Sequence, residues 1–322
     1  MTRTAPLPAQ LIGRPFSVAE ARAEGVSRSR LRASDLVIPT RGARTTHPHR
    51  SVVPEKETPS QRMIRLRDEM IARAREVAPV LTPEQFFSHD VGVGIIGGPL
   101  PYTTADKRAV DVSARRPAGQ PRRAGMIGHR LQQRESSFRI AEGLRTENPA
   151  RLWRQVGARW DLDDLIALGD HLILPRNRLV TLEDLWAEVR VAGDVPGGKL
   201  MRALREIRVG SETPEETKLR LVLVRAGLPE PELNWVLTDE NGEFVARLDL
   251  AYPEYRVCPE SDGRVHAFDE EQFARDADRW DAIRGQGWNH VRILSHHLRP
   301  NPSVAVRKVA EALIAAGWRP GA

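Results

Sequence analysis

The order of local patterns along residues 211–322 constrains the fold more than any other feature of the sequence. Apolar stripes, turn signals and strand-forming runs follow one another there as helix, hairpin, strand, helix, strand and helix. Such an order predicts a mixed sheet flanked by helices, and therefore an α+β or α/β fold. The expected elements span about 214–226, 235–252, 255–261, 271–287, 290–294 and 302–316.

Three carboxylates fall at strand positions that should be buried or half-buried. Asp249 lies between Leu248 and Leu250, and Glu260 and Asp262 lie at the end of the next strand. A charge inside a sheet is costly unless it is paired. Mg²⁺, which binds carboxylate oxygens and keeps waters for substrate phosphates, would compensate these charges. The spacing leaves a second interpretation open, in which Asp262 belongs to a simple turn and Glu260 faces solvent.

Four stretches of this region carry a resemblance to a known family. They read ETPEETKLRLVLVRAGLPEPELN, RLDLAYPEYRV, PESDGRVH and FARDADRWDAIRGQGWNHVRI, in that order along the chain. Together they resemble the very-short-patch-repair-like branch of the PD-(D/E)xK nuclease superfamily, over roughly residues 209–315. The resemblance implies a restriction-endonuclease-like mixed sheet flanked by helices. It also implies an endonuclease that hydrolyses phosphodiester bonds in DNA with Mg²⁺ or Mn²⁺.

The resemblance further implies roles for particular residues. Asp249 and Glu260 match the metal-binding acidic residues of the family, and Glu216 matches the glutamate of the first helix, which would support them. The other matching residues are Asp262 as a further ligand, His266 as a proton-transfer or phosphate-orienting group, and Arg275 and Arg279 as phosphate contacts.

The third strand departs from the usual pattern of this branch, in which a hydrophobic strand is followed by Glu-Tyr-Asp-Gly. Pro259 precedes Glu260 here, and Ser261 stands where the branch has tyrosine. Proline donates no backbone hydrogen bond and is tolerated mainly at sheet edges or bulges. This departure leaves a second function open: a non-catalytic DNA-binding regulator or antitoxin-like module that keeps the nuclease fold as a scaffold.

The first 50 residues indicate a small unit of winged helix-turn-helix type. Residues 17–34 are typical of two short helices joined at Gly25, and residues 36–44 of a strand with a basic turn. This segment is also similar, less sharply, to the winged-helix part of abortive-infection antitoxins. A protein-binding or purely structural role is the alternative. On the DNA-binding interpretation, the second helix presents Arg28, Arg30 and Arg32 to DNA.

Charge is unevenly distributed along the chain. Residues 1–150 hold 25 basic and 15 acidic side chains, whereas residues 211–322 hold 14 basic and 19 acidic ones. Nearly all the basic residues are arginines, whose planar guanidinium suits phosphate. An N-terminal half that binds nucleic acid and a C-terminal part that binds a cation would explain this distribution. A genome that favours arginine codons would explain it as well. We expect three segments: 1–50 winged-helix-like, 51–208 helical or mixed, and 209–322 endonuclease-like.

The composition excludes several classes of protein. No apolar run is long enough for a transmembrane helix, and the first residues lack the apolar stretch of a secretory signal. The single cysteine, Cys258, excludes an intrachain disulfide and a cysteine-rich zinc site. We therefore expect a cytoplasmic protein whose partner is DNA, with no membrane and no small-molecule cofactor. Whether the chain forms a homodimer is left open.

Overall fold

The computed structural model describes residues 5–49, 52–55, 57, 59–103, 109–135, 138–177, 179–262 and 270–321. The chain forms two compact units, Met1–Arg159 and Trp160–Ala322, which we call unit 1 and unit 2. Each unit combines helices and strands, so the expected mixed α and β class is confirmed. In the described part of the chain, no helix is long and apolar enough to cross a membrane.

Unit 1 is built around a five-stranded mixed sheet. Its elements after the first 50 residues are α2 (Pro59–Val77), β3 (Gln85–Phe87), α3 (His89–Ile95), β4 (Val110–Arg115), β5 (Met126–Leu131), β6 (Arg139–Ala141), β7 (Leu144–Thr146) and α4 (Pro149–Gly157). The strands lie in the order β5-β4-β3-β7-β6. An apolar cluster that includes Ile71 of α2, Val91 of α3 and Val112 of β4 packs these two helices on the sheet.

The first 50 residues match the expected winged helix only in part. Helix α1 (Val18–Ala23) begins at the N-cap Ser17, which forms a capping box. The second expected helix is a single 3-10 turn, Arg30–Arg32. The expected strand and basic turn are reduced to the pairing of β1 (Phe16–Ser17) with β2 (Ala43–Arg44). The described part of this segment therefore contains one α-helix, where two were expected.

Unit 2 begins with three helices, α5–α7, which we call the helical layer, and continues with the order of elements expected from the sequence. These elements are α5 (Leu162–Ile173), α6 (Leu182–Ala192), α7 (Lys199–Glu206), α8 (Pro214–Arg225), β8 (Glu232–Thr238), β9 (Phe244–Ala251), β10 (Val257–Asp262), α9 (Glu270–Gly285), β11 (Asn289–Leu294), α10 (Ser295–Leu298) and α11 (Ser303–Ala315). Strands β8 and β9 form an antiparallel hairpin, and β10 pairs with β11 in parallel. The elements expected after residue 211 are all present within a few residues of their expected limits.

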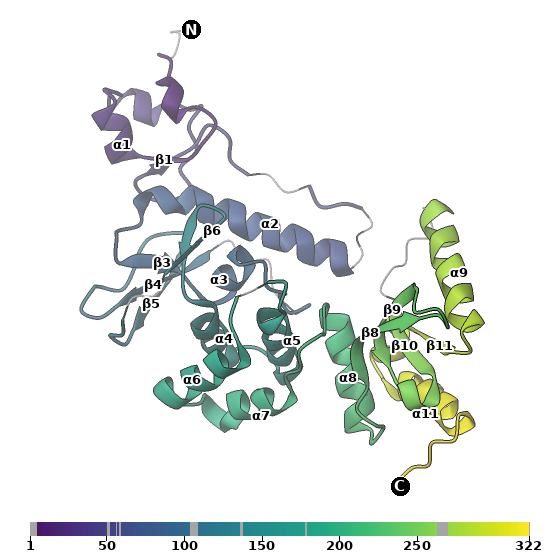
Figure 1. The fold of residues 1–322 in the computed structure, drawn as a ribbon. Helices are drawn as coiled ribbons and strands as arrows, with labels where there is room; N and C mark the ends of the chain where they lie inside the picture. Colours follow the sequence, from purple (N-terminus) through teal and green to yellow (C-terminus); the bar gives the residue numbers. More distant parts are fainter. Residues whose placement is uncertain are drawn as a thin grey trace. The chain divides into compact units, whose positions relative to one another are not determined.

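Two apolar clusters hold the strands of unit 2 between helices. Leu219 of α8 and Val309 of α11 belong to the first, the α8 cluster, which includes Leu250 of β9. Ile283 of α9 belongs to the second, the α9 cluster, which includes Leu248 of β9. Figure 1 shows the strands between α8 and α9. The strands are therefore covered by helices on both faces.

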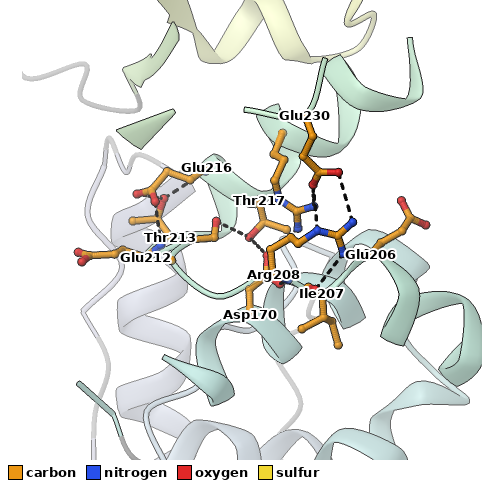
Figure 2. Close-up of polar contacts among 12 residues, drawn as sticks. Asp170, Glu206, Ile207, Arg208, Glu212, Thr213, Glu216, Thr217 and Glu230 are labelled. Carbon is orange, nitrogen blue, oxygen red and sulfur yellow. Dashed lines mark hydrogen bonds and ion pairs between the residues drawn. The ribbon is translucent and has the colours of Figure 1, made fainter. Parts of the chain in front are cut away.

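A buried ion pair connects α5 to α8. The Asp170 carboxylate and the Arg220 guanidinium are both almost fully buried and lie 2.9 Å apart. The Thr217 hydroxyl and the Arg208 backbone N–H also donate to Asp170, at 2.8 and 2.7 Å (Figure 2). Burial raises the pKa of Asp170 to about 6, which leaves the carboxylate ionised at neutral pH. This network connects α5 and α8 within unit 2.

We predict that Asp170→Asn lowers the free energy of unfolding of unit 2 by about 3–5 kcal/mol, because it leaves the Arg220 charge buried without its partner. Asp163→Asn, on the same helix, removes a more exposed partner of Arg225 and should cost less than about 1 kcal/mol. Urea unfolding followed by tryptophan fluorescence reports mainly on unit 2, which holds six of the seven tryptophans. Equal losses in the two variants would contradict this assignment.

Candidate functional site

Three of the expected site residues lie near one another in unit 2. Glu216 of α8 and Glu260 of β10 are buried, and Asp249 of β9 is half-buried. Burial and then the charge of Glu260 raise the pKa of Asp249, and burial and then the charge of Asp249 raise the pKa of Glu216, so the carboxylates also interact electrostatically. The burial of Glu260 excludes the interpretation in which it simply faces solvent.

The start of α8 holds Glu216 in place. The Glu216 backbone N–H donates to the Thr213 hydroxyl oxygen at 3.2 Å, and that hydroxyl donates to Glu216 Oε1 at 2.9 Å (Figure 2). The Glu212 backbone N–H donates to Glu216 Oε2 at 2.7 Å. The positive end of the helix also favours a carboxylate here. Glu216 therefore stabilises the start of α8 in addition to interacting electrostatically with Asp249.

The two apolar clusters of unit 2 meet along β9 near Asp249. Alternate residues of a regular strand face the same side, yet Leu248 packs in the α9 cluster and Leu250 in the α8 cluster. Their partners on β8 divide between the two clusters in the same way. Asn234, which lies opposite Asp249, has a φ of 52°, in the left-handed region. The β8–β9 register continues through this level without a shift, and Ala251 packs in the α9 cluster again, so Asp249 lies where the two apolar clusters meet.

Pro259 fits within β10 without breaking the strand. The Arg256 carbonyl accepts from the Asn289 N–H of β11, whereas Val257 exchanges hydrogen bonds with Tyr252 next to β9. The backbone N–H and C=O groups of successive strand residues point alternately to the two neighbouring strands. The backbone nitrogen of Pro259, like that of Val257, therefore points toward β9. The described residues show no ladder hydrogen bond between β9 and β10 at that level. The missing proline N–H is therefore not required there.

The same bridge sets the register between β9 and β10. In antiparallel order from the Tyr252–Val257 bridge, Asp249 comes opposite Glu260. The two strands also lie side by side beyond the bridge. This register agrees with the electrostatic effect of Glu260 on Asp249.

Glu260 is paired with a cation from α9. Arg279 Nη1 and Nη2 donate to its two carboxylate oxygens at 2.8 and 2.5 Å, and His290 Nε2 lies 3.0 Å from Oε2. Burial alone would raise the pKa of Glu260, but the hydrogen bonds with His290 and Arg279 outweigh it and lower the pKa. The Trp280 ring stacks on His290 with 5.5 Å between centroids. Glu260 is therefore an ionised group held in one orientation.

The pKa values of Asp249 and Glu216 are raised, whereas that of Glu260 is lowered. Burial and the neighbouring Glu260 charge raise the pKa of Asp249 to about 6. Burial and the Asp249 charge raise the pKa of Glu216 to about 7. Repulsion between neighbouring carboxylates disappears when a divalent cation binds between them. Raised pKa values of this kind are typical of functional sites.

Several expected site residues cannot be placed. Asp262 ends β10 and Arg275 lies in α9, but their side chains lie outside the described residues, as does the whole of His266. Their roles stay predictions.

The three arginines expected to contact DNA differ in exposure. Arg28 and Arg32 are exposed in unit 1. Arg30 is buried and donates to both carboxylate oxygens of Asp35, at 2.9 and 2.7 Å. Its Nε also donates to the Ala5 carbonyl at 2.5 Å. Arg30 therefore stabilises this segment and does not face a ligand, which corrects the expectation for this residue.

Two sets of polar residues had no clear signal in the sequence. His290 reaches Glu260 only because β11 pairs with β10 in parallel, which places His290 beside Cys258. In unit 1, the side chains of His89, Asp111 and His129 come together from separate elements. Each of these contacts depends on strand pairing, which residue spacing does not reveal.

Comparison with known proteins finds a limited similarity. Two uncharacterized proteins, from two strains of Mycobacterium tuberculosis, are each 30% identical to this chain over 103 residues. The matched segment is 32% of this chain and 38% of the length of each relative. No family model matches the chain, and no solved structure matches it.

We predict that Glu216→Gln changes the pH dependence of stability. The folded protein keeps the Glu216 proton up to about pH 7, whereas the unfolded chain releases it near 4.5, so this group makes the wild type less stable as pH rises between these values. Glutamine stays neutral throughout. The stability of the variant relative to wild type should therefore increase by about 2–3 kcal/mol from pH 4.5 to pH 8, as measured by chemical unfolding.

The matched control is Glu240→Gln, which changes an exposed glutamate of the β8–β9 turn. Its stability relative to wild type should stay constant over the same pH range. A constant difference for Glu216→Gln as well would contradict the raised pKa of Glu216.

Proposed function

We propose that residues 209–315 form a divalent-metal-dependent endonuclease that hydrolyses phosphodiester bonds in DNA. The observation that carries this proposal is the interacting set of carboxylates Glu216, Asp249 and Glu260, two of which have raised pKa values. The order helix, hairpin, strand, helix, strand supports it, because the first helix and the second and third strands each supply one carboxylate. This arrangement is the one implied by the resemblance to PD-(D/E)xK nucleases.

The donor set fits Mg²⁺ or Mn²⁺. All three residues offer carboxylate oxygens, and Mg²⁺ commonly binds one or two carboxylates and keeps several waters. Arg279 already neutralises Glu260, whereas the raised pKa of Asp249 reflects burial and negative neighbours that outweigh nearby arginines. Asp249 is therefore the main ligand in this proposal, and Glu216 or Glu260 the second. The bound metal would activate water and neutralise charge on the scissile phosphate.

Arg279 and His290 orient the other groups of the proposed site. Arg279 is 33% exposed and is fixed by Glu260 and by the Arg247 carbonyl, which accepts from Nη2 at 2.9 Å. A guanidinium held next to carboxylates is suited to bind a phosphate oxygen. His290 holds the second oxygen of Glu260. Asp262 as a further ligand, His266 as a proton-transfer group and Arg275 as a phosphate contact complete the proposal on the resemblance alone.

Exposed arginines of unit 1 support a DNA-binding role for the basic half of the chain. Arg41 and Arg122 are exposed, and Arg123 Nη1 donates to the Arg41 carbonyl at 2.7 Å. The Thr40 hydroxyl donates to the Ala124 carbonyl at 2.7 Å, so the arginine-rich loop lies next to the segment before β2. Adjacent guanidinium groups on one surface favour contact with a phosphate backbone.

A second candidate function is a DNA-binding regulator or antitoxin-like module without catalysis. The bidentate pairing of Glu260 with Arg279 favours it, because this carboxylate already has a cationic partner without a metal. In that case the buried carboxylates would be stabilised only by the protein.

We predict that the wild type cleaves plasmid DNA in the presence of Mg²⁺ or Mn²⁺ and that Asp249→Asn reduces the rate by at least about 100-fold. The loss follows because a metal ion supplies several kcal/mol of transition-state stabilisation. Asp281→Asn is the matched control, since Asp281 is an exposed aspartate of α9. Wild-type protein that binds DNA but shows no cleavage with either metal would favour the regulator over the nuclease.

We also predict that DNA binding weakens with rising salt and that Arg28→Ala with Arg32→Ala lowers the slope of log affinity against log salt by about two. Each exposed arginine that contacts phosphate releases about one counterion. Arg190→Ala, which changes an exposed arginine of unit 2, is the control. A slope unaffected by the double variant would place the DNA contacts elsewhere, with the Arg122–Arg123 loop as the next surface to test.

A further inference from the structure

A group of metal-ligating side chains lies in unit 1, apart from the proposed nuclease site. His89, Asp111 and His129 each present one ligand atom, and these three atoms lie within 4.8 Å of one another. His89 and Asp111 are buried, and His129 is largely so. We propose that these three residues bind one divalent transition-metal ion, with Zn²⁺ as the ion that fits best. This site is independent of the function proposed for unit 2.

The five-stranded sheet brings the three side chains together. Asp111 lies on β4 and His129 on the parallel strand β5, where His129 pairs with Ser113. Because Asp111 and Ser113 are two residues apart on one strand, Asp111 and His129 face the same side. Asp111 Oδ1 and His129 Nε2 are 2.6 Å apart. His89 begins α3 directly after β3, and its ring lies 4.0 Å from that of His129.

The backbone at His89 is in an unusual conformation. His89 has a φ of 50°, in the left-handed region that few residues other than glycine adopt. Such a conformation costs on the order of 1–3 kcal/mol and is found mainly where a side chain must be held in a particular direction. Here it directs the His89 ring toward Asp111 and His129. This observation is independent of the distances between the ligand atoms.

Hydrogen bonds around the group suit an outer shell for a metal site. Ser88 Oγ lies 2.9 Å from His89 Nδ1, and the Ser113 hydroxyl donates to Ser88 Oγ at 2.6 Å. A metal-binding histidine normally places its second ring nitrogen against such a partner, which fixes the ring and the tautomer. The Gln155 side-chain oxygen also accepts from the His89 backbone N–H at 3.2 Å. These contacts fix His89 before a metal binds.

The Asp111 carboxylate already has a cationic partner. Arg159 Nη1 lies 3.1 Å from Asp111 Oδ1, 4.0 Å from Asp90 Oδ2, and its side chain is 33% exposed. The Arg159 guanidinium is therefore the positive charge beside Asp111 when no metal is bound. Its side chain is exposed enough to move away when a metal ion binds Asp111.

The ligand set selects the class of ion. Two imidazole nitrogens and one carboxylate oxygen suit Zn²⁺ and the neighbouring transition metals, whereas Mg²⁺ and Ca²⁺ prefer oxygen ligands alone. Three protein ligands would leave a fourth position for water or another ligand.

Titration of the chelator-treated full-length protein with Zn²⁺ tests the proposal, with heat and the Co²⁺ absorption spectrum as readouts. We expect the wild type to bind one equivalent of Zn²⁺. In His89→Gln, Asp111→Asn and His129→Gln, which each remove a ligand, the affinity should fall at least 10- to 100-fold, because the loss of an outer-shell partner already costs about that much. His49→Gln, which changes an exposed histidine of unit 1, should bind as the wild type does. Asp249→Asn should also keep this equivalent, which separates the site from the carboxylates of unit 2.

Arg159→Gln distinguishes a metal site from a purely structural network. It removes the cation that competes for Asp111, so Zn²⁺ affinity should rise on the order of 10-fold. A structural network gives no such gain. Should a ligand variant fail to fold, X-ray absorption of the Zn²⁺-loaded wild type must still show imidazole nitrogens in the first shell. The proposal is overturned if the wild type binds no Zn²⁺ or Co²⁺, if the histidine variants bind equally well, or if the spectrum lacks imidazole.

Discussion

The ion pair between Asp170 and Arg220 determines how the helical layer of unit 2 meets the strands. Both charges are buried, so neither helix can shift along the other without exposing an unpaired charge to an apolar environment. The same carboxylate binds the Arg208 N–H and the Thr217 hydroxyl, and Thr217 in turn contacts Ser211 at 2.8 Å. The segment before α8 is therefore held at Arg208 by Asp170 and at Ser211 by Thr217.

This arrangement has a direct effect on the proposed nuclease site. Helix α8 carries Glu216 in its first turn, while Leu219 and Leu223 of the same helix pack against the strands. The position of the first carboxylate thus depends on the helical layer, and the positions of Asp249 and Glu260 depend on the strands. A site assembled from two layers requires that their contact be rigid, and a buried charge pair provides directional rigidity that apolar packing alone lacks.

The elements of unit 2 could be predicted from sequence because their signals are local. The apolar stripe of α8 and the Asp239–Gly242 turn each depend on residues a few positions apart. The environment of Asp170 could not be predicted in this way. From sequence it is one of several aspartates in 161–174 that fit helix caps and exposed faces, and its partner lies 50 residues further along the chain. Arg30 illustrates the same limit, since a basic residue in a basic segment is here a buried structural group.

The two apolar clusters of unit 2 meet along β9. Ala246, Leu248 and Ala251 pack in the α9 cluster, whereas Leu250 packs in the α8 cluster. Regions with separate apolar contacts open with separate free energies in native-state hydrogen exchange. Helix α9 should therefore open separately from helices α8 and α11, while contacts with both clusters protect β9. A local opening of α9 would release Glu260 from Arg279 without disrupting the α8 cluster.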